Sequence, residues 1–248
     1  MKEIKLLQEG IAALRQKDND IERLIAPRAE EVISLLTRYI HEIELFNEAY
    51  GLVGVKDTDE LVIKHILDSM APLGIISRLL ETCKAQKPQI ADAGSGAGLP
   101  GIPLAIALST FDFTLIERMG RRAGFLMNTK AILGVSNIAV EEGELEKTAP
   151  GRFSLVTSRA FKPLEPKLLK TLYKACAEGG FIAAYKGRRE KIEQEMATLV
   201  KPVTLPTAPA KPVTLVKPVH LGGWEAIPYS VPFLDEERHI VVIKKSEI

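Results

Sequence analysis

Apolar residues recur at helical spacing through the first third of the chain and predict amphipathic helices there. Pro27 suits the first turn of such a helix, because the N–H that proline lacks would be unpaired at that position. The apolar positions that follow, spaced by three and four, are Val32, Leu35, Leu36, Tyr39, Ile40, Ile43 and Phe46. Gly51 to Gly54 ends this helix, and a second helical pattern starts near Asp59. We therefore predict that residues 1–83 form a helical extension packed on the remaining domain, 84–248.

From about residue 89 the period changes to short apolar runs separated by helical stretches. The predicted strands are 89–93, 113–117, 137–141, 153–157 and 180–185. Strands that alternate with helices imply right-handed crossovers, so they form a parallel, doubly wound sheet. The fold class predicted from the pattern is therefore α/β.

The end of the chain departs from this alternation. A proline-rich segment, 201–232, leads to the apolar run 238–244 with no crossover helix between them. A strand reached without a crossover predicts a final antiparallel hairpin. The pentapeptide Lys-Pro-Val-Thr-Leu occurs at 201–205 and 211–215, but one repeat of five residues is too short for a repeat architecture.

Composition narrows the class of protein. Apolar residues make up 46% of the 248, which is enough for a large core, and no run is long enough to span a membrane. The first residues lack the apolar stretch of a signal peptide, and Cys83 and Cys176 form no disulfide or metal framework. We therefore predict a cytoplasmic protein with no membrane partner.

The net charge is only +1, so binding to nucleic acid would depend on local clusters of basic residues. Three clusters stand out along the chain: Arg118, Arg121 and Arg122; Arg159 and Lys162; and Lys186, Arg188 and Arg189. A solvated helix face is the ordinary explanation of such clusters.

The strongest signal for a ligand is the glycine-rich stretch that follows the first predicted strand. Asp92 ends the strand, and Gly94, Gly96 and Gly98 follow at alternate positions. Glycines let a ligand approach the backbone closely. Residues 96–101 also match the dinucleotide pattern G-x-G-x-x-G, so an NAD enzyme stays possible. Asp92 suits the ammonium group of an amino-acid moiety, and prolines at 100 and 103 remove donors that a pyrophosphate would use, which favours S-adenosylmethionine.

Further candidate residues lie at the same edge of the predicted sheet. Glu117 ends the second strand, where an acid can accept both ribose hydroxyls of an adenosine ligand. Glu144 and Leu145 follow the third strand, where they could meet adenine. Arg159 follows the fourth strand and could bind a phosphate or carboxylate in forked geometry, or form a structural ion pair.

His65 and Asp68 lie three positions apart, on one face of the predicted N-terminal helices. With four histidines in the chain and no second His/Cys cluster, we predict no metal site. No Ser-His-Asp or Cys-His set is apparent either.

Four segments in order resemble the motifs of one family, the RsmG family, also called glucose-inhibited division protein B. They are residues 64–69 (Lys-His-Ile-Leu-Asp-Ser), 92–104, 158–161 (Ser-Arg-Ala-Phe) and 237–243. The family's enzymes methylate N7 of one guanine in 16S ribosomal RNA, using S-adenosylmethionine. The resemblance implies a class I methyltransferase fold: a seven-stranded sheet, six strands parallel and the last one antiparallel, preceded by helices.

The resemblance also implies roles for residues. Gly94 and Leu99 would line the methionine side of the cofactor, Glu117 would hold the ribose, Glu144 and Leu145 the adenine, and Arg159 would close the pocket. Relatives often carry Asn-Leu-Thr where this chain has residues 51–53, and some carry a basic residue at the position of Gly143. Neither departure touches the glycine-rich stretch.

The implied partner is 16S rRNA, the small ribosomal subunit or its assembly precursor, bound by a monomer. Candidate RNA contacts are His65, Arg118, Arg121, Arg122, Lys186 and Arg188. Arg159 is expected to position a ligand rather than to perform chemistry. The alternatives are a methyltransferase acting on another substrate, an NAD-dependent oxidoreductase, and a ribosome-binding factor without catalysis.

Overall fold

The computed structural model describes residues 2–83, 85–159, 163–200 and 223–245. Seven strands form one sheet: β1 (Gln89–Ala93), β2 (Asp112–Glu117), β3 (Ile138–Glu142), β4 (Phe153–Ser158), β5 (Cys176–Lys186), β6 (Trp224–Tyr229) and β7 (Arg238–Lys244). Their order in the sheet is β3-β2-β1-β4-β5-β7-β6. Strands β1 to β5 are parallel, β7 is antiparallel to β5, and β6 is antiparallel to β7. Six strands therefore run one way and β7 the other, which confirms the predicted fold class.

The sequence pattern missed one strand of the final hairpin. β6 lies inside the segment read as proline-rich, and Pro228 is one of its residues. Proline cannot donate to a β-ladder, so strands tolerate it at the edge of a sheet, and β6 is the edge strand here. The pentapeptide repeat at 201–205 and 211–215 lies outside the described residues.

Helices precede the sheet and connect its strands. They are α1 (Lys2–Lys17), α2 (Asn19–Ile25), α3 (Ala29–Tyr50), α4 (Thr58–Leu61), α5 (Asp68–Met70), α6 (Leu73–Glu81), α7 (Gly101–Ala107), α8 (Gly120–Leu133), α9 (Pro166–Ala175) and α10 (Arg189–Val200). Short 3₁₀ turns occupy Ala26–Arg28 and Leu145–Lys147, and a π-helical turn, Val62–Leu67, joins α4 to α5.

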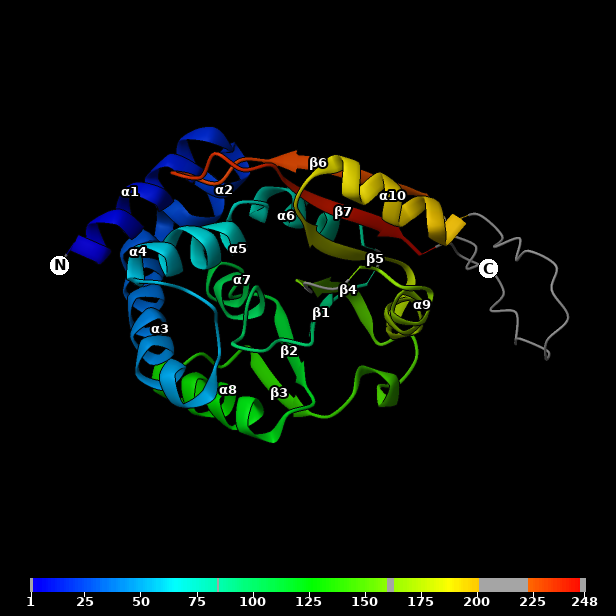
Figure 1. Cartoon of the computed structure of the whole chain (residues 1–248), viewed down its shortest axis with the longest axis horizontal. Coiled ribbons are helices and arrows are strands. Elements are labelled where there is room, and N and C mark those ends of the chain that lie inside the picture. Colours follow the sequence, from blue (N-terminus) through cyan, green and yellow to red (C-terminus); the bar gives the residue numbers. More distant parts are fainter. Residues whose placement is uncertain (1, 84, 160–162, 201–222, 246–248) are drawn as a thin grey trace, which may run out of the picture.

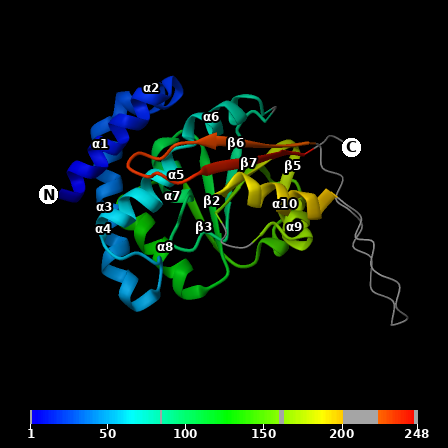
Figure 2. The ribbon, with the colours of Figure 1, turned by 45° about the horizontal axis from the view of Figure 1, so that its top comes forward.

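Two hydrophobic clusters cover the two faces of the sheet. On β1, Ile90 belongs to one cluster and Ala91 to the other, because successive side chains of a strand point to opposite faces. The larger cluster also contains residues of α1, α3, α7 and α8, and the smaller one contains residues of α9 and α10. Figures 1 and 2 show the helices on both sides of the sheet, with the hairpin β6–β7 along one margin.

The helices that precede β1 share the larger cluster with the sheet, so the core runs across residue 83. The predicted division of the chain at that residue stays a prediction. As expected, Gly51 ends α3: it has a left-handed φ of 58°, and its N–H bonds the Asn47 carbonyl. Tyr39 of α3 reaches the glycine-rich stretch, where its hydroxyl donates to the Ala97 carbonyl at 2.7 Å. Within the described residues, no helix is long and apolar enough to cross a membrane.

Candidate functional site

The strand order reverses between β1 and β4, which are neighbours in the sheet although β2 and β3 intervene in sequence. In doubly wound sheets, ligands bind at the carboxyl ends of the strands beside such a reversal. The glycine-rich loop, residues 94–101, leaves the carboxyl end of β1, and Arg159 directly follows β4. The fold therefore places these two predicted elements on either side of the point where the strand order reverses.

The glycine-rich loop satisfies most of its own N–H groups. Gly94 and Ser95 donate to the Ile116 carbonyl, and Gly96 donates to Glu117 Oε2 at 2.9 Å. Gly98 and Leu99 both donate to the Ser95 carbonyl. The loop thus offers a ligand a closely approachable backbone surface more than a set of free donors.

Two glycines of this loop meet very different surroundings. A Cβ added at Gly94 would have no heavy atom within 4 Å, and this residue has a φ of +71°. A Cβ added at Gly101 would lie 2.4 Å from Leu115 Cδ2 and 2.7 Å from Asp92 Oδ2. Gly94 therefore borders open space, whereas the absence of a Cβ at Gly101 allows α7 to pack against β2.

Asp92 is buried, with 1% of its surface exposed. Its Oδ2 accepts the Gly101 N–H at 3.1 Å, and its Oδ1 accepts the Thr157 hydroxyl at 3.3 Å. Burial raises the pKa of Asp92 to about 6, although these hydrogen bonds oppose the shift. Asp92 thus joins β1, β4 and the start of α7, and its predicted contact with a cofactor ammonium stays a prediction.

Glu117 lies at the carboxyl end of β2, where it is 4% exposed. One carboxylate oxygen accepts the Gly96 N–H and the other accepts the Met119 N–H, each at 2.9 Å. Each oxygen has a second lone pair, so the carboxylate can still accept a ribose hydroxyl. The two backbone bonds fix its orientation beside the glycine-rich loop.

The segment after β3 is the most open part of the predicted site. Glu144 is exposed and pairs with Lys147 at 3.7 Å, and Leu145 packs against the smaller hydrophobic cluster. The Gly143 N–H donates to the Glu117 carbonyl at 2.9 Å, which brings this segment next to the end of β2. A Cβ at Gly143 would meet nothing within 4 Å, so a side chain there would fit this fold.

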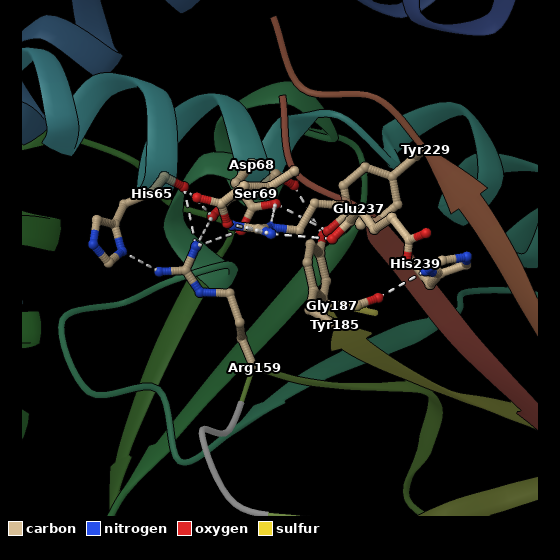
Figure 3. A network of polar contacts seen from close by, with 11 residues as sticks. His65, Asp68, Ser69, Arg159, Tyr185, Gly187, Tyr229, Glu237 and His239 are labelled. Carbon is tan, nitrogen blue, oxygen red and sulfur yellow. Dashed lines mark hydrogen bonds and ion pairs between the residues drawn. The ribbon is translucent and has the colours of Figure 1, made fainter. Parts of the chain in front are cut away.

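Arg159 points from the end of β4 to the π-helical turn (Figure 3). Its Nη1 donates to the His65 carbonyl, the Ser69 hydroxyl and Asp68 Oδ2 at 3.2–3.4 Å, and its Nη2 donates to His65 Nδ1. His65 and Asp68, which the sequence placed on one face, thus both meet Arg159. Ala160 and Phe161 lie outside the described residues.

Desolvation controls the protonation of the groups that surround Arg159. Burial, helped by the Arg159 charge, lowers the pKa of His65 to about 4. The imidazole is therefore neutral at pH 7, which lets Nδ1 accept a hydrogen bond. Burial also raises the pKa of Asp68 from its ordinary value, against the attraction of Arg159 and Arg238.

Sequence reasoning missed three residues of this network. The Tyr229 hydroxyl donates to Asp68 Oδ1 at 3.0 Å, Arg238 Nε lies 3.4 Å from the same oxygen, and the Tyr185 hydroxyl donates to the Ser69 carbonyl at 2.9 Å. Arg238 lies in a segment already noted for its family resemblance, which was the available signal. Nothing in the pattern singled out the two tyrosines.

The structure places the predicted RNA contacts in different environments. Arg118 is exposed, whereas Arg122 donates to the Gly51 carbonyl at 3.0 Å and Arg121 lies over the Tyr50 ring at 5.7 Å. Lys186 pairs with Glu195 at 2.7 Å, and both side chains are nearly buried. Arg188 is exposed. Within the described part of the chain, no group of three His, Cys, Asp or Glu side chains could hold a metal ion.

Comparisons with known proteins identify the family of this chain. Residues 32–205 match the model of the GidB family, described as rRNA small subunit methyltransferase G. Curated proteins named ribosomal RNA small subunit methyltransferase G are similar along most of their length. The Treponema denticola protein is 35% identical over 85% of each chain, and the Treponema pallidum protein is 36% identical over 96% of this chain and 92% of its own.

Solved structures support the fold. The CurJ carbon methyltransferase aligns with a TM-score of 0.56 at 9% identity, covering 89% of this chain and 68% of that one. A tRNA (m1A58) methyltransferase from Aquifex aeolicus aligns with a TM-score of 0.50 at 10% identity, covering 71% and 70%. The fold is therefore that of methyltransferases, and the sequence matches place this chain in the family of rRNA small subunit methyltransferase G, GidB.

Proposed function

We propose that this protein transfers a methyl group from S-adenosylmethionine to N7 of a guanine in 16S rRNA. The observation that carries the proposal is the family match, which spans both the glycine-rich loop after β1 and Arg159 after β4. These two elements flank the strand-order reversal, where a doubly wound sheet binds its ligand. The substrate is 16S rRNA, the small subunit or its precursor.

The residues around the glycine-rich loop fit this cofactor. Gly94 borders open space, so the methionine portion can approach the backbone there, next to Leu99. Glu117 keeps acceptor capacity for the ribose hydroxyls, and the segment of Glu144 and Leu145 adjoins it through the Gly143–Glu117 bond. Each of these residues would therefore contact a different part of one extended ligand.

The reaction needs no general base. S-adenosylmethionine, when bound, supplies an electrophilic methyl group, and guanine N7 has a lone pair and no proton to lose. The protein must therefore align N7 with the methyl group and exclude competing nucleophiles, which is catalysis by positioning. Arg159 fits an anchoring role, for a cofactor carboxylate or an RNA phosphate, because a cation would not stabilise the positive charge that the purine gains.

RNA must present N7 in a loop or as a splayed base, since the major groove of an RNA helix is too narrow for side chains. Arg118 and Arg188 are exposed and follow β2 and β5 at the carboxyl edge of the sheet. We assign phosphate contacts to these two first. Arg121 and Arg122 contact Tyr50 and Gly51, so part of their effect on RNA binding would come from fixing the position of that segment.

Methyl transfer tests the function directly. Purified protein with tritiated S-adenosylmethionine should label 16S rRNA or small subunits from cells that lack this protein, and mapping should place the product at one guanine N7. Label confined to small molecules or proteins would replace the substrate assignment. Calorimetry with S-adenosylmethionine and with NAD separates a methyltransferase from the oxidoreductase alternative.

Salt dependence tests the RNA contacts. Arg118→Ser should weaken RNA binding and reduce the slope of log affinity against log salt by about 1. Lys87→Ser is the matched control, because Lys87 lies just before β1, at the opposite edge of the sheet, and is 69% exposed. If both variants keep the original slope, Arg118 makes no phosphate contact.

A further inference from the structure

Asp68 connects chain segments that are far apart in sequence. It follows the π-helical turn, and its carboxylate meets Arg159 after β4, Tyr229 at the end of β6 and Arg238 at the start of β7. β6 runs parallel to β5, so the β6–β7 loop lies at the carboxyl edge of the sheet, as Arg159 does. Figure 3 shows the side chains of Arg159 and Tyr229 on either side of Asp68.

The two oxygens of the Asp68 carboxylate have different partners: one faces Arg159 after β4, and the other faces the hairpin β6–β7. Oδ2 faces Arg159 Nη1 at 3.4 Å, while Oδ1 accepts the Tyr229 hydroxyl at 3.0 Å and lies 3.4 Å from Arg238 Nε. Tyr229 and Arg238 therefore fix the rotation of the carboxylate. That rotation in turn sets where Oδ2 meets Arg159.

The charged side chains of this arrangement are largely buried, so each depends on its partners rather than on water. The side chains of Asp68, Arg159 and Arg238 are 8%, 15% and 18% exposed. Two guanidinium groups around one buried carboxylate repel each other if that carboxylate is removed. Among the described residues, Arg159 would then have no acidic partner to hold it at the end of β4.

The Arg159 guanidinium keeps donor capacity in this arrangement. Its hydrogen bonds use Nη1 and Nη2, and among the described residues its Nε–H has no acceptor. An anion could take this N–H without displacing Asp68. The network thus orients a cation and leaves part of it available, as expected for an anchor rather than for a purely structural ion pair.

We propose that Asp68 is a positioning residue that acts on methyl transfer through Arg159, and that Tyr229 and Arg238 fix Asp68 for this task. The inference rests on the proposed function, because Arg159 is taken to anchor the cofactor or RNA. Asp68 itself touches neither ligand. It selects one orientation of the Arg159 guanidinium from those that a flexible arginine could adopt.

A double-mutant cycle on kcat/KM for 16S rRNA tests the proposal. Asp68→Asn should lower kcat/KM by about 10- to 100-fold, the effect of misplacing an anchoring group by about 1 Å. In the background of Arg159→Gln, the same change should alter kcat/KM by less than about twofold, because the residue that Asp68 positions is already gone. An undiminished effect of Asp68→Asn in that background would overturn the proposal.

Glu42→Gln is the matched control. Glu42 is a buried carboxylate that accepts a hydrogen bond from Asn128 at 3.3 Å, and it joins α3 to α8 outside the network. It should change kcat/KM by the same small factor in both backgrounds. A loss of stability at Glu42 would affect the two backgrounds alike, because Glu42 contacts Asn128 and has no contact with Arg159, whereas positioning through Arg159 would not.

Tyr229→Phe provides the second variant if Asp68→Asn does not fold. It removes one hydrogen bond to Oδ1 and keeps the ring, so kcat/KM should fall by about 3- to 10-fold, and only when Arg159 is present. Equal losses in both backgrounds would contradict the proposal. Absence of methyl transfer by the unmodified protein would instead refute the proposed function, and the cycle would then be measured on affinity for S-adenosylmethionine.

Discussion

The glycine-rich loop and the Asp68 network, formed by Asp68, Arg159, Tyr229 and Arg238, lie at the same edge of the sheet but are built in opposite ways. The loop is one continuous stretch, and its shape comes from backbone hydrogen bonds and from glycine conformations. The network consists of side chains from distant segments, with Tyr229 and Asp68 separated by 161 positions. A site made of backbone depends on local sequence, whereas a site made of side chains depends on the whole fold.

The largest expected difference between the two regions is in stability. Asp68→Asn should lower the free energy of unfolding by about 3 kcal/mol, because it leaves the largely buried Arg159 guanidinium without its carboxylate, although Arg238 keeps its pair with Glu236 at 3.0 Å. Gly94→Ala, in the loop, should cost only about 1 kcal/mol, the penalty of a left-handed φ in open space. Unfolding in guanidinium chloride measures both, and equal losses would contradict the contrast.

Asp92, before the glycine-rich loop, and His65, beside Arg159, should respond to pH with opposite signs, while Asp68, whose pKa is also raised, follows the direction of Asp92. Asp92 has a pKa raised from 3.8 to about 6, so its contribution to stability is lost as the pH rises through this range. His65 has a pKa lowered from 6.5 to about 4, so its contribution is lost as the pH falls through that range. Each shift corresponds to about 3 kcal/mol, and the two nearly cancel between pH 4 and pH 6.5.

Single variants separate these opposing contributions. In Asp92→Asn the remaining His65 makes the free energy of unfolding rise from pH 4 to pH 6.5 relative to the unmodified protein. In His65→Asn the remaining Asp92 makes it fall. Denaturant unfolding at both pH values gives the differences, and a change of the same sign in both variants would be incompatible with the assigned pKa shifts.

The sequence predicted the fold well where the pattern is local. Strands β1 to β4 were predicted to within one residue at each end, because their apolar runs are short and bounded by turns. β6 was missed since Pro228 argues against a strand unless the strand's position at the sheet edge is known. The π-helical turn keeps the spacing of apolar residues that an α-helix has, so periodicity could not reveal it.

The positions of the site residues at the sheet edge were predictable from the sequence, whereas the hydrogen-bond partners of their side chains were not. The glycine-rich loop, Glu117 and Arg159 each follow a strand, and the rule for parallel sheets brings them to one edge. Which atoms satisfy Asp92 or Arg159 depends on helices that arrive from elsewhere in the chain. Asp92 was expected to face a ligand, and its bonds to Gly101 and Thr157 follow only from the packing of α7 and β4.

Within the loop itself, packing and ligand approach can be separated by alanine. Gly101→Ala should destabilise the protein by about 1–3 kcal/mol, because its Cβ would overlap Leu115 and Asp92. Gly94→Ala should cost less stability but weaken S-adenosylmethionine binding at least about tenfold, since its Cβ enters the space proposed for the cofactor. Calorimetry and chemical unfolding measure the two quantities.

Gly124→Ala is the control for these variants. Gly124 lies inside α8 with no positive φ and open space around it, so alanine should stabilise the helix by about 0.5–1 kcal/mol. Cofactor affinity should not change. If Gly94→Ala binds S-adenosylmethionine as Gly124→Ala does, the open space at Gly94 is not the cofactor site.

The smallest predicted effect concerns the loop that closes the network, between β6 and β7. Phe233 has a φ of 66°, while every other positive φ among the described residues belongs to a glycine. The Leu234 N–H donates to the Val231 carbonyl at 3.2 Å, so Phe233 occupies the third position of a turn that favours glycine. Its side chain is 54% exposed and loses little contact on removal.

Phe233→Gly should therefore raise the free energy of unfolding by up to about 1 kcal/mol, because relief of the left-handed strain exceeds the added entropy of the unfolded chain. Phe233→Ala keeps the strain and loses the ring, so it should be no more stable than the unmodified protein. Chemical unfolding of the two variants decides between backbone and side chain. If the alanine variant is the more stable of the two, the left-handed conformation of Phe233 costs no free energy. Phe233 would then be no more strained than the glycines with positive φ in the glycine-rich loop.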